Sequence, residues 1–243
     1  MSIIAVFVFI ALFFITAGYG QFTKKNWGMA INNKLGWILM EAPVFIVMLI
    51  LWLNSDRTAN ISTTIILLLF ELHYFQRSFI FPFLLKGKGK MPFSIILMGV
   101  IFNVSNALMQ GGWLFYFAPE QMYTNNWLLS SKFIIGTIIF LTGMAINIHS
   151  DSIIRNLRKP GDSAHYLPQK GMYKYVSSAN YFGEIIEWIG FAILTWSTAG
   201  AVFALWTFAN LVPRAAKIHS KYKVEFAEQM KNKNIKIIFP YIY

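Results

Sequence analysis

The sequence predicts an all-α integral membrane protein with seven transmembrane helices, its N-terminus outside and its C-terminus in the cytoplasm. Of the 243 residues, 56% are hydrophobic and only 13% are charged, which is too apolar for an ordinary soluble domain. The charged residues lie between long apolar runs, and the cations fall mainly in every second loop. This alternation is typical of helices that cross a bilayer several times.

The first apolar run, from about Ile3 to Gly18, opens directly at the N-terminus. It lacks a basic segment before it and a cleavage site of small residues, so we expect a retained helix and not a signal peptide. Six further runs follow, at about 36–53, 62–85, 93–117, 127–149, 180–197 and 199–212. The last two are separated only by Thr198 and its small neighbours, without a charge. They could form one long kinked helix, but together they are long enough to cross the bilayer twice.

The placement of the cations sets the orientation. Cations follow the first, third, fifth and seventh runs, whereas the alternate loops hold almost none. The cation-rich loops contain Lys24, Lys25, Lys34, Lys86, Lys88, Lys90, Arg155, Arg158, Lys159, Lys170, Lys174, Arg214, Lys217, Lys221 and Lys223. Because loops rich in Lys and Arg stay in the cytoplasm, the number of crossings is odd. The net charge of +11 is thereby explained as an orientation signal, and we expect no nucleic-acid partner.

Other features bound the function further. The chain has no cysteine, which excludes disulfides, thiolate nucleophiles and cysteine-ligated metals. His149 has no second histidine three or four residues away, so we expect no metal site. No internal repeat, low-complexity segment or long linker divides the chain, and we expect one membrane domain over residues 1–243.

Two stripes of polar residues lie where apolar runs meet the predicted cytoplasmic side. Each stripe has helical spacings of three and four, which place its members on one face. The first stripe is Asn147, Asp151, Arg155 and Arg158, and the second is Asn180, Glu184 and Glu187. Together they suit a nucleotide cofactor, since cations bind phosphates, carboxylates bind ribose hydroxyls and carboxamides bind a base or nicotinamide. Neither the G-x-G-x-x-G nor the P-loop signature occurs, so we expect a site between membrane helices.

Several other polar residues lie inside the apolar runs, where they usually face the interior of a helix bundle. They are Glu41, Glu71, His73, Tyr74, Arg77, Asn103, Asn106 and Gln110. Taken singly, a buried glutamate or arginine is often one member of a structural pair, so a structural role for Glu71, Arg77 and Glu187 stays open.

Six segments resemble the steroid 5α-reductase (3-oxo-5α-steroid 4-dehydrogenase) family. They are Asn-Ile-His-Ser-Asp at 147–151, Leu-Arg-Lys-Pro-Gly at 157–161, Gly-Glu-Ile-Ile-Glu-Trp-Ile-Gly at 183–190, His73-Tyr74-Phe75, Met109-Gln-Gly111 and Phe239-Pro-Tyr-Ile-Tyr243. The likeness is collinear from about residue 18 to the C-terminus and is strongest between 143 and 190. Such a long match is far more specific than any one of its motifs.

The resemblance implies a seven-helix membrane enzyme that uses NADPH to reduce the 4,5 double bond of 3-oxo-Δ4 steroids. Hydride passes to C5 and a proton to C4, and the C3 carbonyl gains enolate character that hydrogen-bond donors stabilise. Glu41 and Tyr74 match the family's two catalytic residues at this oxygen. Glu41 must be protonated to donate, which burial in an apolar cavity favours. The resemblance places the substrate site mainly in the first four helices.

The resemblance also implies a cofactor site, mainly within residues 147–223. Asn147, Asp151, Asn180 and Glu184 match positions around the nicotinamide and its ribose, and Arg158, Arg214 and Tyr222 match positions on the phosphate and adenosine side. Lys88 replaces a family arginine, which keeps the charge but loses the bidentate geometry. His219 is a weaker candidate contact. Met40 stands where the animal enzymes carry glutamine, which removes one polar contact at the substrate end, and His165 stands where an aromatic is expected.

Other functions remain open at this stage. The same fold also occurs in reductases of other lipid enones, polyprenols and enoyl-CoA, and in isoprenylcysteine methyltransferases that use S-adenosylmethionine. A transporter lined by intramembrane acids is a third class, but the bare outer loops offer it no exit route. We expect a steroid or related lipid substrate, contact with membrane lipid and a monomer. The composition favours a bacterial cytoplasmic membrane, although an endoplasmic reticulum membrane fits the topology equally.

Overall fold

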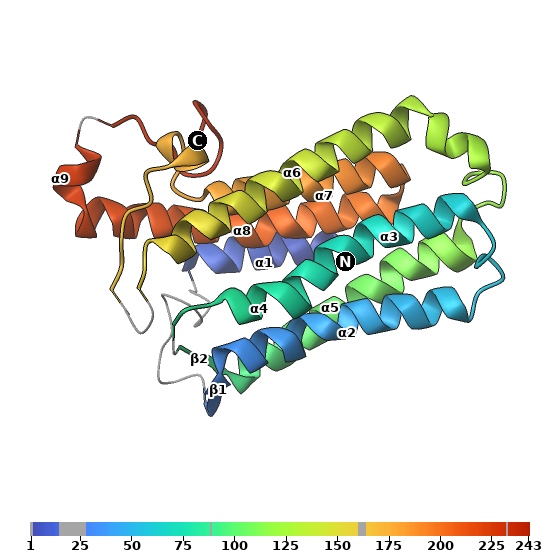
Figure 1. Ribbon diagram of the computed structural model, residues 1–243, viewed down its shortest axis with the longest axis horizontal. Helices are drawn as coiled ribbons and strands as arrows, with labels where there is room; N and C mark the ends of the chain where they lie inside the picture. The colour runs from blue at the N-terminus through green and yellow to red at the C-terminus, as the bar shows by residue number, and fades with distance from the viewer. Residues whose placement is uncertain (1, 15–27, 88, 160–163, 232) are drawn as a thin grey trace. The chain divides into compact units, whose positions relative to one another are not determined.

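A computed structural model describes residues 2–14, 28–87, 89–159, 164–231 and 233–243, and the protein is mostly helical (Figure 1). The chain forms two compact units. Unit 1 consists of Met1–Thr16, Ile135–Ile193 and Gly200–Tyr243, and unit 2 of Ala17–Ile134 and Leu194–Ala199.

Unit 2 is built around the long helices α2 and α5. Its elements are β1 (Ala30–Asn32), α2 (Asn33–Leu53), α3 (Ile61–Phe75), the π-helix η3 (Gln76–Ile80), α4 (Phe81–Leu84), β2 (Lys90–Pro92), α5 (Phe93–Gly112), the π-helix η4 (Trp113–Phe117) and the 3₁₀-helix η5 (Asn125–Leu129). The two strands pair antiparallel, with Ile31 opposite Met91. This pairing aligns the N-terminal ends of α2 and α5, which then pack together around Met40, Met91 and Ile96.

Unit 1 contains the other helices. They are α1 (Ser2–Phe14), α6 (Ser131–Asn156), the 3₁₀-helix η6 (Gly171–Lys174), α7 (Ala179–Thr195), α8 (Thr198–Glu225) and α9 (Ala227–Met230). Of these, α6 and α8 begin, and α7 ends, in unit 2. The core of unit 1 joins α7 to α8 and to the C-terminal segment through Ile185, Val212, Ala215 and Ile238. The apolar spacing of α7 and α8 thus buries one face of each helix.

Helices occupy each of the seven predicted apolar runs. The last two runs are separate helices, as expected, because α7 ends at Thr195 and Trp196 adopts a positive φ of 46° before α8 begins. One difference is that α8 continues to Glu225, well past the apolar run. Residues 15–18 of the first run lie outside the described residues.

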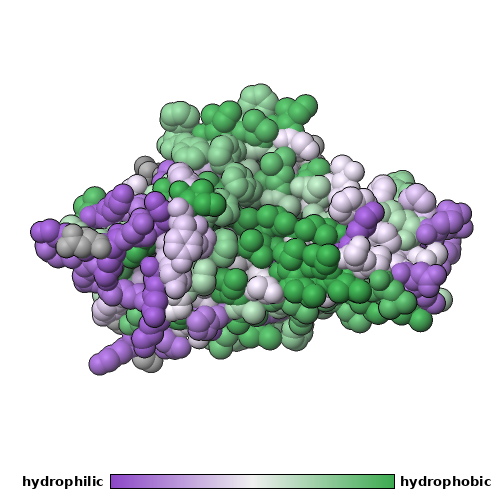
Figure 2. Space-filling model, turned by 90° about the horizontal axis from the view of Figure 1, so that it is seen from above, coloured by the Kyte–Doolittle hydropathy of each residue, from purple (hydrophilic) through white to green (hydrophobic). Residues whose placement is uncertain are grey.

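Four helical stretches are long and apolar enough to cross a membrane by length and composition, at 33–53, 61–84, 93–117 and 131–156. Large apolar side chains on them, such as Leu68, Ile101 and Ile138, are more than half exposed, as expected for surfaces that face lipid. Figure 2 shows hydrophobic residues over much of the visible face. The protein is therefore a multi-pass membrane protein. The count of seven crossings and the orientation remain predictions.

Candidate functional site

Helices α6 and α7 pack closely against each other, backbone to backbone, at glycine residues. A Cβ atom added to Gly183 would lie 2.5 Å from the backbone nitrogen of Asn147, and one added to Gly143 would lie 2.6 Å from the Cα of Glu187. Both distances are far below van der Waals contact, so only glycine fits. Small residues at a helix crossing let two membrane helices pack backbone to backbone. The polar residues beside these glycines are therefore brought into contact.

The two polar stripes meet at this crossing. Asn147 donates hydrogen bonds through Nδ2 to the carbonyl oxygen of Asn180 at 3.0 Å and to Glu184 Oε2 at 3.4 Å. Asn180 Nδ2 donates in turn to Asp151 Oδ1 at 3.0 Å. Asn147 and Asp151 are buried, whereas Asn180 and Glu184 are half-buried. We call these four residues the α6–α7 polar cluster. Two carboxamides and two carboxylates, joined by hydrogen bonds across the crossing, form a preorganised polar wall.

Tyr173, which the sequence analysis missed, supports this cluster from the segment that precedes α7. Its hydroxyl donates to Asn180 Oδ1 at 3.4 Å, and the side chain packs with Val176 and Ala179. Burial raises the pKa of Tyr173 well above its usual value, and the nearby Asp151 carboxylate adds to the effect. The phenol is therefore a neutral donor at any physiological pH. A tyrosine in a loop carries no periodic signal, so spacing could not have identified it.

Arg214 contacts a second missed tyrosine, Tyr181, and both Tyr181 and Arg158 lie near Tyr222. Arg214 Nε donates to the Tyr181 hydroxyl at 2.9 Å. Burial, together with the neighbouring Tyr181, raises the pKa of Tyr222 to about 12, although the positive charge of Arg158 acts to lower it. Arg158 Nε also donates to the carbonyl oxygen of Ala164 at 3.0 Å, which fixes part of its guanidinium. Tyr181 directly follows Asn180 in the sequence, but it does not share the helical spacing of Asn180, Glu184 and Glu187.

Of the two further cofactor candidates, His219 and Lys88, the structure describes His219. His219 Nδ1 lies 2.6 Å from Ser177 Oγ, and its side chain is buried. Burial lowers the pKa of His219, and Lys223 lowers it further, so the imidazole is neutral near pH 7. Lys88 lies outside the described residues.

In unit 2, the polar edge of α5 holds both predicted catalytic residues. Asn103 Nδ2 donates to Glu41 Oε2 at 3.1 Å and to the carbonyl oxygen of Met40 at 2.8 Å. Asn106 Nδ2 donates to the hydroxyl oxygen of Tyr74 at 3.2 Å. The spacing of three between the two asparagines puts them on one face of α5, so a single helix face positions the carboxyl group of α2 and the phenol of α3.

The Tyr74 phenol belongs to a longer chain of hydrogen bonds. Gln110 Nε2 donates to Asn106 Oδ1 at 3.3 Å and to the carbonyl oxygen of Ala199 at 2.9 Å. Asn106 and Gln110 are fully buried. A phenol oxygen that accepts a hydrogen bond becomes a better donor through its own O–H, because hydrogen bonds in a chain polarise one another. This arrangement suits a side chain that donates to an oxygen on which negative charge develops.

Arg77, another polar residue of unit 2, packs against aromatic rings. Its guanidinium carbon lies 4.9 Å from the ring centroid of Trp37 and 4.5 Å from that of Phe81. Such stacking stabilises a cation at a partly desolvated position. Arg77 therefore packs against two aromatic rings.

The fold, the α6–α7 polar cluster and the polar residues along α5 define a multi-pass helical membrane protein whose polar sites are built from helix faces. The sequence model described as 3-oxo-5-alpha-steroid 4-dehydrogenase matches residues 89–243. The chain is 35% identical over 240 residues to the "3-oxo-5-alpha-steroid 4-dehydrogenase 1" of Bos taurus, covering 97% of this chain and 92% of that protein. It is 34% identical over 247 residues to the "Steroid 5-alpha-reductase DET2" of Gossypium hirsutum, covering 100% and 95%. It is 38% identical over 240 residues to the "3-oxo-5-alpha-steroid 4-dehydrogenase 2" of Sus scrofa, covering 96% and 91%. The chain belongs to the 3-oxo-5-alpha-steroid 4-dehydrogenase family.

Proposed function

We propose that this protein reduces the 4,5 double bond of 3-oxo-Δ4 steroids to 5α-dihydro steroids with NADPH. Family membership and the names of the relatives support the reaction class. The structural observation that carries the proposal is the pair of hydrogen bonds by which α5 positions Glu41 and Tyr74. This pairing is the arrangement that a carbonyl-polarising site requires.

The chemistry of an enone explains why these two groups are needed. Reduction at C5 places negative charge on the C3 oxygen, and a donor to that oxygen lowers the barrier. Tyr74 donates as a neutral phenol, whereas Glu41 donates only when it carries a proton. Asn103 and Asn106 fix the two side chains in advance, so the site loses little free energy in ordering them during the reaction.

The described residues fit the proposed cofactor. When bound, NADPH supplies the hydride. The α6–α7 polar cluster offers carboxamides to an amide and carboxylates to ribose hydroxyls, and Arg158 and Arg214 offer guanidiniums to phosphates. Tyr222 and His219 are proposed on the adenosine side. Lys88 is proposed as a further cationic contact, on the strength of its match to the family pattern.

The proposed function is tested with purified protein in detergent, supplied with NADPH and a panel of 3-oxo-Δ4 steroids such as testosterone and progesterone. We expect NADPH oxidation with formation of the 5α-dihydro product. Enoyl-CoA and polyprenol substrates in the same assay distinguish the related reductases. Protection from thermal unfolding by NADPH, but not by S-adenosylmethionine, distinguishes the methyltransferases. A chain that oxidised NADPH with none of the steroids would contradict the steroid assignment.

Replacing Tyr173 with phenylalanine is expected to weaken NADPH binding about 5-fold, because one hydrogen bond to Asn180 contributes about 1 kcal/mol. The Tyr173 hydroxyl contacts Asn180 and is not itself proposed to touch the substrate, so kcat at saturating NADPH is expected to change little. The dissociation constant of NADPH, measured by fluorescence, checks this expectation. Tyr175→Phe removes a hydroxyl from an exposed residue two positions away and serves as the control. Equal NADPH affinity in the two variants would contradict a positioning role for Tyr173.

We further propose that the chain crosses the membrane seven times as a single membrane domain and acts as a monomer. The cation-rich loops support a cytoplasmic C-terminus. We propose a bacterial cytoplasmic membrane on the basis of the cysteine-free composition.

A further inference from the structure

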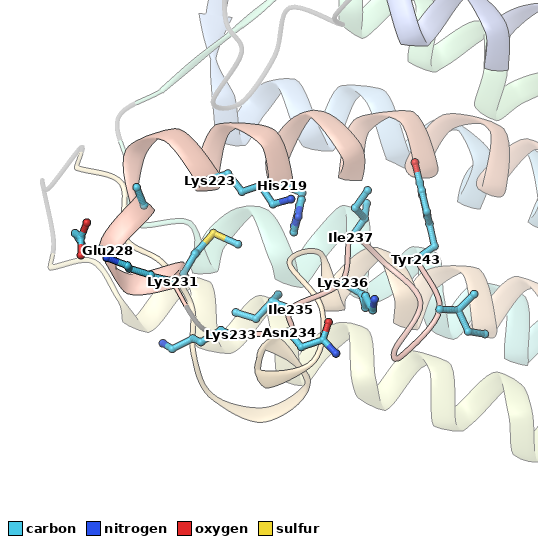
Figure 3. Close-up of a pocket in the computed structure, with 13 residues that line it drawn as sticks. His219, Lys223, Glu228, Lys231, Lys233, Asn234, Ile235, Lys236, Ile237 and Tyr243 are labelled. Carbon is cyan, nitrogen blue, oxygen red and sulfur yellow. The ribbon is translucent and has the colours of Figure 1, made fainter.

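A cavity of about 740 Å³ lies in unit 1, and none of its lining residues belongs to the α6–α7 polar cluster (Figure 3). It is partly open and is lined by the C-terminal part of α8, by α9 and by the last residues of the chain. The lining residues are His219, Lys223, Ala227, Glu228, Met230, Lys231, Lys233, Asn234, Ile235, Lys236, Ile237, Ile242 and Tyr243. Apart from His219, none of them has a role in the proposed reaction.

The cavity has an excess of positive charge. Four of its lining residues are lysines, and Glu228 is its only carboxylate side chain. Lys233 Nζ donates to Gln169 Oε1 at 2.9 Å, which leaves its charge uncompensated. Within the part of the chain that the structure describes, the ammonium groups of Lys223, Lys231 and Lys236 have no hydrogen-bond or ion-pair partner. Cations gathered around a cavity attract an anion.

The nearest further carboxylate on α8 is already engaged. Glu225 Oε1 lies 3.6 Å from Lys221 Nζ, and its Oε2 lies 3.6 Å from His165 Nδ1. Its charge is therefore shared with groups that do not line the cavity. The lysines of the lining outnumber its carboxylates even when the main-chain carboxylate of Tyr243 is counted with Glu228, so the cavity attracts an anion from outside.

The walls of the cavity are held in place by backbone hydrogen bonds. The backbone nitrogen of Lys236 donates to the carbonyl oxygen of Tyr175 at 2.8 Å, and that of Ser177 donates to the carbonyl oxygen of Lys236 at 2.9 Å. Ile238, two residues on, is fully buried in the core of unit 1. The lysine side chains thus extend from an anchored segment and not from a free tail.

The apolar part of the lining indicates which anion fits. Ile235, Ile237, Ile242 and Tyr243 line the cavity together with the lysines. The adjoining surface is apolar as well, since Ile242 is 81% exposed and Tyr241 76% exposed. Ammonium groups beside exposed aliphatic and aromatic side chains are typical of the boundary between lipid headgroups and acyl chains. A soluble anion would leave this apolar surface in water.

We propose that this cavity binds the phosphate group of an anionic membrane lipid. The lysines of the lining, Lys231 and Lys236 among them, attract the phosphate, and Ile242 and Tyr243 contact the upper part of the acyl chains. The lipid then fixes the C-terminal segment against α8. Each lysine near an anionic membrane surface contributes about 1 kcal/mol of attraction, so removal of two charges is expected to weaken lipid binding 10-fold or more.

The test uses the full chain in nanodiscs of phosphatidylcholine, with or without phosphatidylglycerol as the anionic probe. Phosphatidylglycerol is expected to raise the Tm of the unaltered chain and to remain bound in native mass spectrometry. The Lys231→Gln/Lys236→Gln variant is expected to lose both effects while its NADPH affinity is unchanged. Lys170→Gln/Lys174→Gln removes two exposed lysines that do not line the cavity and is expected to behave as the unaltered chain.

Three results would overturn the proposal. Equal loss in the two double variants would mean that phosphatidylglycerol acts through the general surface charge. Equal stabilisation by inorganic phosphate in phosphatidylcholine would assign the cavity to a soluble anion. Displacement of phosphatidylglycerol by NADP⁺ would assign it to the cofactor. If the Lys231→Gln/Lys236→Gln variant proved unfolded, each single variant, with half of the charge change, is expected to lose part of the phosphatidylglycerol effect, and full retention in both would equally contradict the assignment.

Discussion

Tyr74→Phe is expected to lower kcat for progesterone reduction about 100-fold or more, because removal of one donor to a developing oxyanion has an effect of about 10²–10³-fold. The hydroxyl is the only part of the side chain that is lost, and Asn106 then keeps its bond to Gln110. NADPH affinity is expected to stay within about 2-fold of the unaltered value, since the proposed cofactor residues belong to other helices. Single-turnover kinetics at saturating NADPH give the rate of the chemical step.

The matched control is Tyr116→Phe, which removes an exposed phenol whose hydroxyl donates to the carbonyl oxygen of Leu51 at 2.9 Å. This variant is expected to turn over at the unaltered rate. Glu41→Gln is expected to lose turnover as well, because an amide is a weaker donor than a carboxylic acid. If both Tyr74→Phe and Glu41→Gln kept full turnover, the assignment of the carbonyl-polarising pair would be wrong.

Gly143→Ala is expected to destabilise the protein by about 1–3 kcal/mol, the usual effect of overpacking a tight core. The added methyl group would lie 2.6 Å from the Cα of Glu187 and from the carbonyl oxygen of Gly183. These are backbone atoms that cannot rotate away, so α6 and α7 have to separate. Separation would disrupt the bonds between Asn147 and Asn180, and we expect NADPH affinity to fall at least 10-fold. Thermal unfolding in detergent and NADPH titration measure the two effects.

Gly112→Ala serves as the control, because it makes the same change inside another helix. Its added methyl group would meet side-chain atoms of Phe117 at 3.5 Å, an ordinary contact. We expect this variant to be at least as stable as the unaltered chain, since alanine favours a helix over glycine. A Gly143→Ala protein with unchanged stability and affinity would show that the helix crossing tolerates separation.

The helical spacing of polar residues was sufficient to predict the α6–α7 polar cluster. Asn147 and Asp151 were assigned to one face of α6, Asn180 and Glu184 to one face of α7, and the hydrogen bonds join these faces. The spacing could not show why the faces meet, because close packing at Gly143 depends on three-dimensional fit. The roles of all four residues in binding a cofactor remain predictions.

Some features of the structure depend on tertiary contacts and could not be predicted from the sequence. Tyr173 and Tyr181 have no spacing that separates them from other aromatic residues, and only their hydroxyl partners reveal them. The extension of α8 to Glu225 crosses a run of lysines that hydropathy assigned to a loop. The pairing of β1 with β2 joins segments far apart in sequence, and each strand has only three residues. Such short strands lack the alternation by which strands are recognised.

The most direct test of the account follows the transferred atoms. The protein is incubated with progesterone and NADPH that carries deuterium at C4 of the nicotinamide, and the steroid product is analysed by mass spectrometry and NMR. The proposed reaction predicts a 5α-dihydro steroid that carries solvent hydrogen at its C4. Deuterium is expected at C5 of this product from one of the two stereoisomers of NADPH labelled at C4 of the nicotinamide. A reduced steroid without deuterium at C5 from either stereoisomer, or with the 5β configuration, would contradict it.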